Sequence, residues 1–424
     1  MEVEKNLTGI SIEELKKVVQ AFHKNDLRVI MDVVYNHTMF GEESYFHQLV
    51  PFYYHRTTSE GKFSNASACG NETASDKPMM RKFMLESLKY WVNEYHIDGF
   101  RFDLMGIHDI ETMNMISTEL HKIKPDIVLL GEGWTAGDSP LPENQRSLKK
   151  YTYRLDKIAA FSDDMRDGLK GSVFAAEDRG FVSGKKGMEE SVKFGIIAST
   201  KHPQIDYSKV NYSKEPWAAE PYQCINYAEC HDNHTLWDRF LNSNAKDTEG
   251  DRIKMHKLIQ AIVLTSQGIP FIHAGMEFLR TKKGVENSYN SPDDINEIDW
   301  NRKTRYAEVS TFIKNLIEVR KKHPAFRMPA TELVAKNLEF MNMLSKAGTT
   351  EGVIGYTLNG KAVGDKWKTI VVLFNANTKF VSVDIPNAKW KVICDGEKVF
   401  EKGLKDFKGN RFDVPALSAV ILAQ

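Results

Sequence analysis

The chain has 424 residues, which is long enough for two or three domains and a sizeable buried core. Its 57 basic and 57 acidic residues give a net charge of zero, so the composition predicts no general attraction to nucleic acid or to an anionic membrane. Hydrophobic residues make up 42% and charged residues 27%, and no apolar run is long enough to predict a membrane span. The composition therefore indicates a globular protein with neither nucleic acid nor a membrane as its partner.

The four cysteines, Cys69, Cys224, Cys230 and Cys394, are too few to crosslink a chain of this length. Cys224 and Cys230 lie in a segment that we predict to be extended. Their Cα atoms would be about 20 Å apart, which is too far for a disulfide. Residues 1–5 lack the basic and then apolar pattern of a secretory signal. The cellular location therefore stays open.

The first predicted elements are a helix and a strand. Ser11 and Glu14 form a capping-box pattern, and apolar residues follow at helical spacing, which predicts a helix over 12–25. Residues 27–35 are rich in β-branched side chains without alternation, a pattern typical of a strand buried on both faces of a parallel sheet. The Ser-, Asn- and Gly-rich segment 53–78 is predicted to be a long loop, and long loops often carry function.

The same pattern of helix and buried strand recurs along the chain. Further helices are predicted over 79–95, 108–123 and 252–266, and further strands over 97–103, 127–132, 158–161, 223–228 and 269–274. This alternation predicts an α/β fold with a parallel sheet, and the closed form of such a fold that we expect is the (β/α)8 TIM barrel. We count six strands where that barrel has eight. The predicted fold is therefore a TIM barrel that lacks about the first two strands.

The pattern changes near residue 333. A last helix is predicted near 304–322, and short alternating runs such as 369–374 and 381–385, separated by turn residues, then predict a small antiparallel β-sandwich. The predicted domains are a partial catalytic (β/α) barrel over 1–332 and a C-terminal β-sandwich over 333–424.

Four of the predicted strands end in carboxylates, namely Asp32, Asp103, Glu132 and Asp232. A single acid at a strand end is usually a turn residue or a helix cap. In a barrel, however, the strand ends share one rim, where four acids can converge. Two carboxylates about 5–5.5 Å apart support retaining glycoside hydrolysis. Arg101 would lower the pKa of Asp103, and the apolar neighbours of Glu132 would raise its pKa so that it can donate a proton.

Four motifs carry a family resemblance. They are Asp-Val-Val-Tyr-Asn-His at 32–37, Gly-Phe-Arg-Phe-Asp at 99–103, Gly-Glu-Gly-Trp at 131–134 and His-Asp-Asn at 231–233. In this order they resemble the four conserved regions of the α-amylase superfamily, glycoside hydrolase family 13. Residues 103–106, 131–134 and 287–293 further resemble the type I pullulanase group of that family. The resemblance extends over about residues 12–322.

The resemblance implies roles for individual residues. Asp103 would be the nucleophile, Glu132 the general acid/base and Asp232 the stabiliser of the transition state. The implied substrate-binding residues are Asp32, His37, Arg101, Leu104, Met105, Trp134, His231, Asn233, Arg280, Tyr289 and Asp293. The implied reaction is hydrolysis of α-1,6 branch linkages in pullulan, starch or glycogen-type glucans through a covalent glycosyl-enzyme intermediate. An α-glucan is therefore the expected partner.

The chain departs from the family at its N-terminal end. The debranching enzymes carry a Tyr-Asn-Trp-Gly-Tyr-Asp-Pro motif before the helix that we expect to begin at Ser11, and no such stretch occurs here. We therefore expect an N-terminally incomplete chain that hydrolyses poorly without a complementing N-terminal segment. The alternatives are a catalytically impaired glucan-binding remnant, or an α-glucan hydrolase or transglycosylase of different linkage preference. No cofactor is predicted: Asn36 resembles a calcium ligand of some amylases, but a full set of oxygen ligands is not evident.

Overall fold

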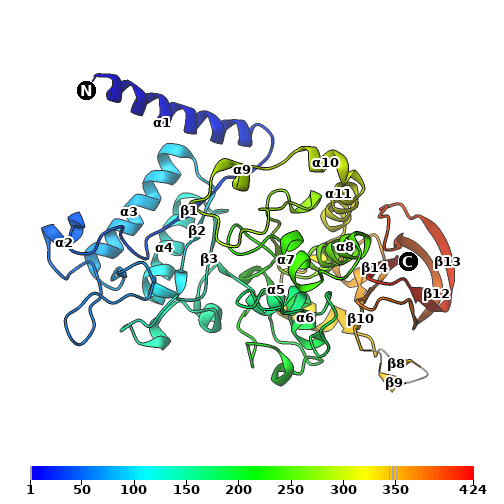
Figure 1. The fold of residues 1–424 in the computed structure, drawn as a ribbon. Helices are drawn as coiled ribbons and strands as arrows, with labels where there is room; N and C mark the ends of the chain where they lie inside the picture. The colour runs from blue at the N-terminus through cyan, green and yellow to red at the C-terminus, as the bar shows by residue number, and fades with distance from the viewer. Residues whose placement is uncertain (1, 343, 346–347, 350) are drawn as a thin grey trace. The chain divides into compact units, whose positions relative to one another are not determined.

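A computed structural model describes residues 2–342, 344–345, 348–349 and 351–424 (Figure 1). For residues 2–10, 344–345 and 348–349 it describes the backbone. The chain divides into two compact units, Met1–Phe161 and Ser162–Gln424. This division differs from the predicted domain boundary near residue 332, which stays a prediction.

The first unit is built on parallel strands flanked by helices. Its strands are β1 (Ile30–Val33), β2 (Gly99–Phe102), β3 (Val128–Gly131) and β4 (Ile158–Phe161), and they follow one another in this order. Its α-helices are α1 (Glu2–His23), α2 (Tyr45–Leu49), α3 (Pro78–Tyr95) and α4 (Ile110–Ile123). Helices α3 and α4 lie beside the strands (Figure 1). The predicted parallel α/β arrangement is confirmed for this unit.

Two predictions about the N-terminal elements are wrong. Ser11 lies inside α1 and does not cap it, because the helix-favouring Glu and Lys residues before it extend the helix. Strand β1 is not buried on both faces: Ile30 is 42% and Val34, just after the strand, 53% exposed, since β1 is the edge strand of its sheet. The apolar stripe of α1 is exposed as well, with Phe22 at 45%. This unit therefore presents an apolar edge formed by α1 and β1.

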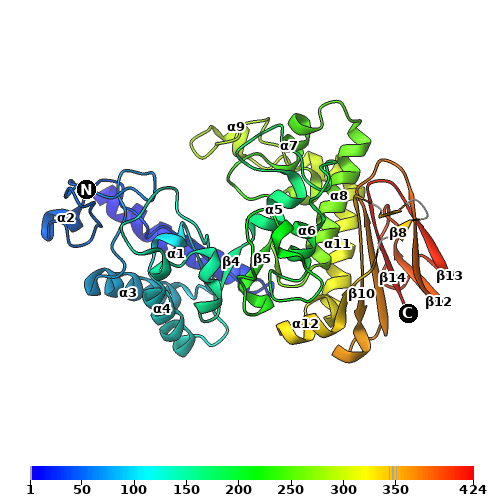
Figure 2. The same cartoon turned by 90° about the horizontal axis from the view of Figure 1, so that it is seen from below.

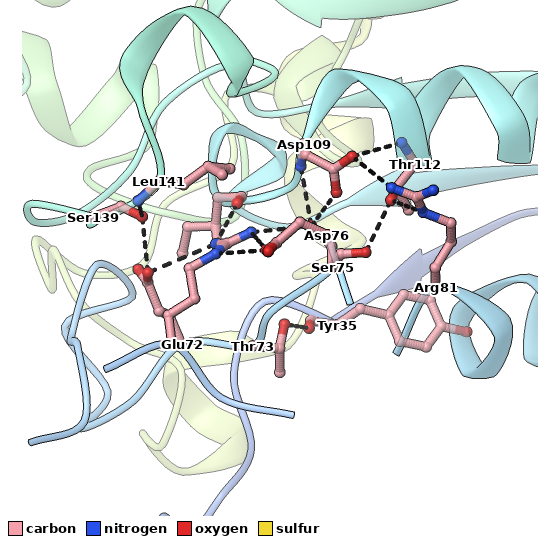
Figure 3. Close-up of polar contacts among 12 residues, drawn as sticks. Tyr35, Glu72, Thr73, Ser75, Asp76, Arg81, Asp109, Thr112, Ser139 and Leu141 are labelled. Carbon is pink, nitrogen blue, oxygen red and sulfur yellow. Dashed lines mark hydrogen bonds and ion pairs between the residues drawn. The ribbon is translucent and has the colours of Figure 1, made fainter. Parts of the chain in front are cut away.

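The predicted loop over 53–78 is irregular up to the start of α3 at Pro78, and a buried polar network anchors it (Figure 3). The Arg56 guanidinium donates to the carbonyl oxygen of Ile107 at 2.8 Å and to Oδ1 of Asp76 at 2.9 Å. The fully buried Glu72 accepts a hydrogen bond from Oγ of Ser139 at 2.8 Å. The network thus ties the segment to the loops that follow β2 and β3.

Asp109 connects this network to helix α4. Its Oδ1 accepts a hydrogen bond from the backbone N–H of Thr112 at 2.8 Å and so caps the helix, and its Oδ2 accepts one from Oγ of Ser75 at 2.7 Å (Figure 3). Burial opposes ionisation of Asp109, but these hydrogen bonds, with a further contribution from Arg81, lower its pKa below the usual value. A lowered pKa in the folded state stabilises the fold above the pKa of the unfolded chain, and this stabilisation is lost as the pH falls.

We expect Asp109→Ala to lower the free energy of unfolding by about 2 kcal/mol at pH 7, because it removes a helix cap and leaves buried donors unpaired. The difference from the unaltered chain should shrink as the pH falls below about 4. Urea unfolding at pH 7 and pH 3.5 measures both effects. The exposed Asp126, changed to Ala, is the control and should cost less than about 0.5 kcal/mol. Equal losses in the two variants at pH 7 would contradict the role given to Asp109.

The second unit combines a short parallel pair with a larger antiparallel sheet. Strands β5 (Cys224–Asn226) and β6 (Ile269–Pro270) pair in parallel. Its α-helices are α5 (Asp163–Lys170), α6 (Glu189–Ile196), α7 (Leu236–Ser243), α8 (Glu249–Thr265), α9 (Asp293–Asn296), α10 (Asn301–Arg305), α11 (Ala307–Lys322) and α12 (Thr331–Asn337). Helix α8 packs against α11 and against β14 of the antiparallel sheet, and α12 and α6 also contact strands of this sheet (Figure 2).

The C-terminal strands form a sheet in the order β13-β12-β14-β11-β10-β7. They are β7 (Leu338–Phe340), β10 (Val353–Asn359), β11 (Thr369–Asn375), β12 (Val381–Cys394), β13 (Lys405–Val414) and β14 (Ser418–Ala423), and β8 (Leu344–Ser345) and β9 (Gly348–Thr349) form a separate hairpin. Alternate apolar residues of these strands, including Val371, Trp390 and Leu422, pack into one core. The predicted C-terminal antiparallel structure is confirmed.

Two expectations from composition agree with the structure. All four cysteines are free. Across the described residues, no helix has the length and apolar character that a membrane crossing requires.

Candidate active site

Arg101 brings three of the predicted site carboxylates together in the first unit. Its Nη1 contacts Oδ1 of Asp32 at 2.8 Å and Oδ1 of Asp103 at 2.7 Å, and its Nη2 contacts Oε1 of Glu132 at 2.6 Å. Burial would lower the pKa of this guanidinium, but Glu132, Asp32 and Asp103 outweigh that effect and raise it above the usual value. The planar guanidinium of Arg101 therefore contacts both Asp103 and Glu132, which lie close to each other.

The backbone explains why these side chains meet. Asp103 and Glu132 are the first residues after β2 and β3, and Asp32 is paired in register with Arg101 on the neighbouring strand. Side chains at positions 101 and 103 point to the same face of the sheet, because alternate residues of a strand do so. Parallel pairing then places the ends of β2 and β3 side by side.

The surroundings of Glu132 differ from the prediction. It is buried, as its apolar neighbours suggested, but polar groups contact both of its oxygens. Oε1 pairs with Arg101, and Oε2 accepts a hydrogen bond from the backbone N–H of Leu104 at 2.9 Å. The prediction of an apolar setting is wrong, because the strand-end geometry directs two N–H donors at this carboxylate.

Asn36 is a site residue to which the sequence analysis gave no catalytic role. Its Nδ2 donates to Oδ2 of Asp103 at 2.8 Å and to the backbone oxygen of Asp103 at 2.9 Å. Its Oδ1 lies 2.6 Å from Nδ1 of His37, so the same amide orients both Asp103 and His37. Asn36 is completely buried. Its position four residues after Asp32, just beyond the end of β1, was the feature of the sequence that could have indicated a site residue.

Leu104, Met105 and Trp134 lie on the adjacent loops after β2 and β3. Leu104 adopts a left-handed backbone conformation (φ 40°), and Met105 is buried. A Cβ atom at Gly106 would lie 2.5 Å from the backbone oxygen of Trp134, so the loops approach each other at a distance that only glycine allows. These three predicted residues therefore share one region of the first unit.

His231, Asp232 and Asn233 belong to the second unit. They lie in a turn beyond the end of β5, so the prediction that Asp232 ends a strand is wrong; the strand stops at Asn226. The imidazole Nε2 of His231 is 3.5 Å from Oδ2 of Asp232, and both side chains are more than half exposed. Asn233 has a left-handed backbone (φ 60°), which turns the chain sharply after Asp232.

A buried lysine supports this turn. Nζ of Lys282 donates to the backbone oxygens of His231 at 3.1 Å and Glu286 at 2.9 Å. Burial lowers the pKa of this amine despite the nearby carboxylate of Asp232. The sequence offered no signal for Lys282, because it lies far along the chain from the turn that it holds.

Arg280 is held by a chain of hydrogen bonds through His273 and Glu229, two residues that were not predicted to belong to the site. Nδ1 of His273 is 2.9 Å from Oε1 of the buried Glu229, and Nη1 of Arg280 is 3.1 Å from Nε2 of His273. Nη2 of Arg280 donates to the backbone oxygen of Asn296 at 2.7 Å. The imidazole therefore donates through Nδ1 to the carboxylate and accepts through Nε2 from the guanidinium.

Tyr289 and Asp293 lie on the loop that Arg280 contacts through Asn296. The Asn296 amide closes this loop by donating to the backbone oxygens of Ser288 at 2.7 Å and Ser291 at 3.0 Å. Tyr289 is 83% exposed, and Asp293 is exposed at the start of α9. The loop brings these two residues and Arg280 into one part of the second unit.

Comparisons with known proteins agree with the motifs. The family model described as "Pullulanase, all-beta domain" matches residues 334–398. A pullulanase of Bacillus subtilis (strain 168) is 39% identical over 383 residues, which are 90% of this chain and 51% of that protein. The solved structure of a pullulanase from Bacillus acidopullulyticus has 42% identity and a TM-score of 0.89, with 97% of this chain and 48% of that chain covered.

A second solved structure extends the likeness. It is a pullulanase from Paenibacillus barengoltzii in complex with maltohexaose and α-cyclodextrin, with 42% identity and a TM-score of 0.88 over 97% of this chain and 61% of that chain. The comparisons agree with the family resemblance that the motifs carry, since the relatives and the solved structures are pullulanases. Over nearly its whole length the chain is similar to pullulanases in sequence and in fold. It spans about half the length of the Bacillus relatives it matches.

Proposed function

We propose that this chain carries the chemistry of a retaining glycoside hydrolase that cleaves α-1,6 linkages in pullulan, starch or glycogen-type α-glucans. The observation that carries the proposal is the single guanidinium of Arg101 shared by Asp103 and Glu132. Two adjacent carboxylates are what the double-displacement reaction requires. The relatives support the glucan as substrate, since the Paenibacillus barengoltzii pullulanase is described in complex with maltohexaose. They do not favour the alternatives of a non-catalytic binder or of a different linkage preference.

In the proposed mechanism, a carboxylate oxygen of Asp103 attacks the anomeric carbon while Glu132 protonates the oxygen of the departing branch. Water, deprotonated by Glu132, then hydrolyses the glycosyl ester and regenerates Asp103. Arg101 and Asn36 orient the nucleophile. Asp232 would stabilise the flattened, positively charged sugar ring and so bind the transition state more tightly than the ground state.

The remaining substrate contacts follow from the family motifs. His37, Arg101, Asp32 and His231 would hold the reacting glucose. Leu104, Met105 and Trp134 would form the leaving-group side, and Arg280, Tyr289 and Asp293 the far side. Asn233 would be a further substrate-binding residue. The division into a partial barrel over 1–332 and a C-terminal domain over 333–424 belongs to the same proposal.

We further propose that the parallel strands are part of a (β/α)8 barrel whose first two strands come from a complementing N-terminal segment. The support is the exposed apolar edge of the first unit, with Ile30 and Val34 on the strand side and Phe22 on α1. An edge strand such as β1 has unpaired backbone N–H and C=O groups, which favour pairing with a further strand. On this proposal, residues 1–424 alone hydrolyse pullulan slowly.

The test is a reducing-sugar assay on pullulan with residues 1–424, alone and mixed with the part of the Bacillus subtilis relative that lies outside the matched region. We expect weak activity alone and an increase of at least about tenfold on mixing. Bovine serum albumin at the same concentration is the control for non-specific stabilisation. Turnover by the chain alone that equals a full-length relative would refute the need for complementation, and the absence of hydrolysis in every mixture would count against the proposed activity.

A further inference from the structure

A groove of about 860 Å³ lies on the C-terminal sheet, where β12, β13 and β14 meet. None of its lining residues belongs to the motifs that define the candidate active site. Its lining includes four lysines and two tryptophans: Lys389, Lys391, Lys402, Lys408, Trp367 and Trp390. A groove of this volume is large enough for a ligand of several sugar rings.

The lysines give the groove an excess of positive charge. Lys389 and Lys408 are paired directly opposite each other on β12 and β13, an arrangement that is unfavourable when both are charged. Among the described residues, no hydrogen bond or ion pair links these two ammonium groups, or those of Lys391 and Lys402, to a protein carboxylate.

Three carboxylates also line the groove, those of Glu401 and Asp406 and the terminal carboxylate of Gln424, and they do not fully balance this charge. Glu401 already contacts Lys322 at 3.6 Å and Nε2 of His323 at 3.6 Å. Asp406 is opposite Lys391 on the neighbouring strand and is exposed. Three carboxylates therefore face four lysines, of which Lys389 and Lys408 oppose each other, and the remaining positive charge is suited to an anionic ligand.

Trp367 adds an apolar surface to the same groove. Its ring is stacked on the buried imidazole of His323, with centroids 3.4 Å apart and planes at 14°. One face of the indole is thereby covered, so the part that lines the groove is its other face or its edge. A rigid aromatic ring beside a cluster of cations suits a ligand that has both an apolar ring face and a negative group.

We propose that this groove binds a saccharide that carries an anionic substituent, and specifically an α-glucan with phosphate monoesters. The identity of the sugar rests on the proposed function, whereas the requirement for negative charge rests on the lysines alone. Lys389 and Lys408 would bind the phosphate oxygens, and Trp367 would pack against a neighbouring sugar ring. A neutral glucan would leave the opposed lysines uncompensated.

The test is isothermal titration calorimetry with phosphorylated dextrins prepared from starch and with the same dextrins after phosphatase treatment. The protein is residues 1–424 with Asp103→Asn, so that hydrolysis does not change the ligand. The candidate active site would bind both preparations alike, so the groove is measured by the additional binding of the phosphorylated dextrin. We expect this additional binding to disappear after phosphatase treatment and to weaken at least about tenfold in the double variant Lys389→Gln/Lys408→Gln. Lys361→Gln/Lys398→Gln removes two exposed lysines of the same domain outside the groove and should leave the affinity unchanged.

Equal affinity for both dextrin preparations, or an unchanged affinity in Lys389→Gln/Lys408→Gln, would overturn the proposal. Inorganic phosphate that binds as tightly as the phosphorylated dextrin would overturn its saccharide part. Trp367→Leu provides an independent check and should weaken dextrin binding more than phosphate binding. The readout contains no catalytic step, so a failure here is separate from a failure of the proposed hydrolysis.

Discussion

Asp103→Asn is expected to reduce the release of fluoride from α-maltosyl fluoride by at least about a thousandfold, because an amide cannot form the glycosyl ester. Fluoride is a leaving group that needs no protonation, so the assay reports on the nucleophile alone. Mass spectrometry of the unaltered chain, treated with a slowly hydrolysed fluorinated analogue, should locate the covalent adduct on Asp103.

Two matched variants make this expectation specific. Glu132→Gln should still release fluoride in the first step, because that step does not use its proton, while its turnover of pullulan falls steeply. Asp32→Asn keeps the nucleophile and changes another carboxylate on Arg101, so its loss should be much smaller than that of Asp103→Asn. Fluoride release by Asp103→Asn at the unaltered rate would remove Asp103 as the nucleophile.

Arg101→Met is expected to lower the free energy of unfolding by about 3 kcal/mol at pH 7.5, because it leaves neighbouring carboxylates without their shared cation. The raised pKa of Arg101 means that its pairing stabilises the fold wherever the carboxylates are ionised. The loss should therefore shrink toward pH 4, where protonation relieves the repulsion. Urea unfolding of Arg101→Met and of the unaltered chain at pH 7.5 and pH 4 measures this loss.

The control is an arginine in the same unit whose ion pair is exposed. Arg28 contacts Asp126 at 2.7 Å with both side chains more than half exposed, so Arg28→Met should cost less than about 0.5 kcal/mol. Arg101→Lys keeps the positive charge but not the planar guanidinium. Compared with Arg101→Met, it should restore the free energy of unfolding without restoring fluoride release. Equal losses in Arg28→Met and Arg101→Met would contradict the central position given to Arg101.

Local pattern was sufficient to predict much of the secondary structure. The apolar spacing over 79–95 corresponds to α3, and the run 158–161 coincides with β4. Helix α5 was missed because its buried face includes Asp164, Arg166 and Lys170. The apolar stripe of this eight-residue helix consists of Met165 and Leu169 alone, which is too short for a helical pattern to stand out in the sequence.

Sequence by itself determined which residues we propose to carry the chemistry, because the acids near predicted strand ends, and the motifs around them, are visible in the order of the chain. It also determined that Arg101 and Asp103 share a side, since alternation along a strand is a property of the local backbone. Only the tertiary structure decided that the same guanidinium contacts Asp32 and Glu132, and that Asn36 binds Asp103. Those contacts depend on the register between parallel strands, which is set by packing among segments far apart in the sequence.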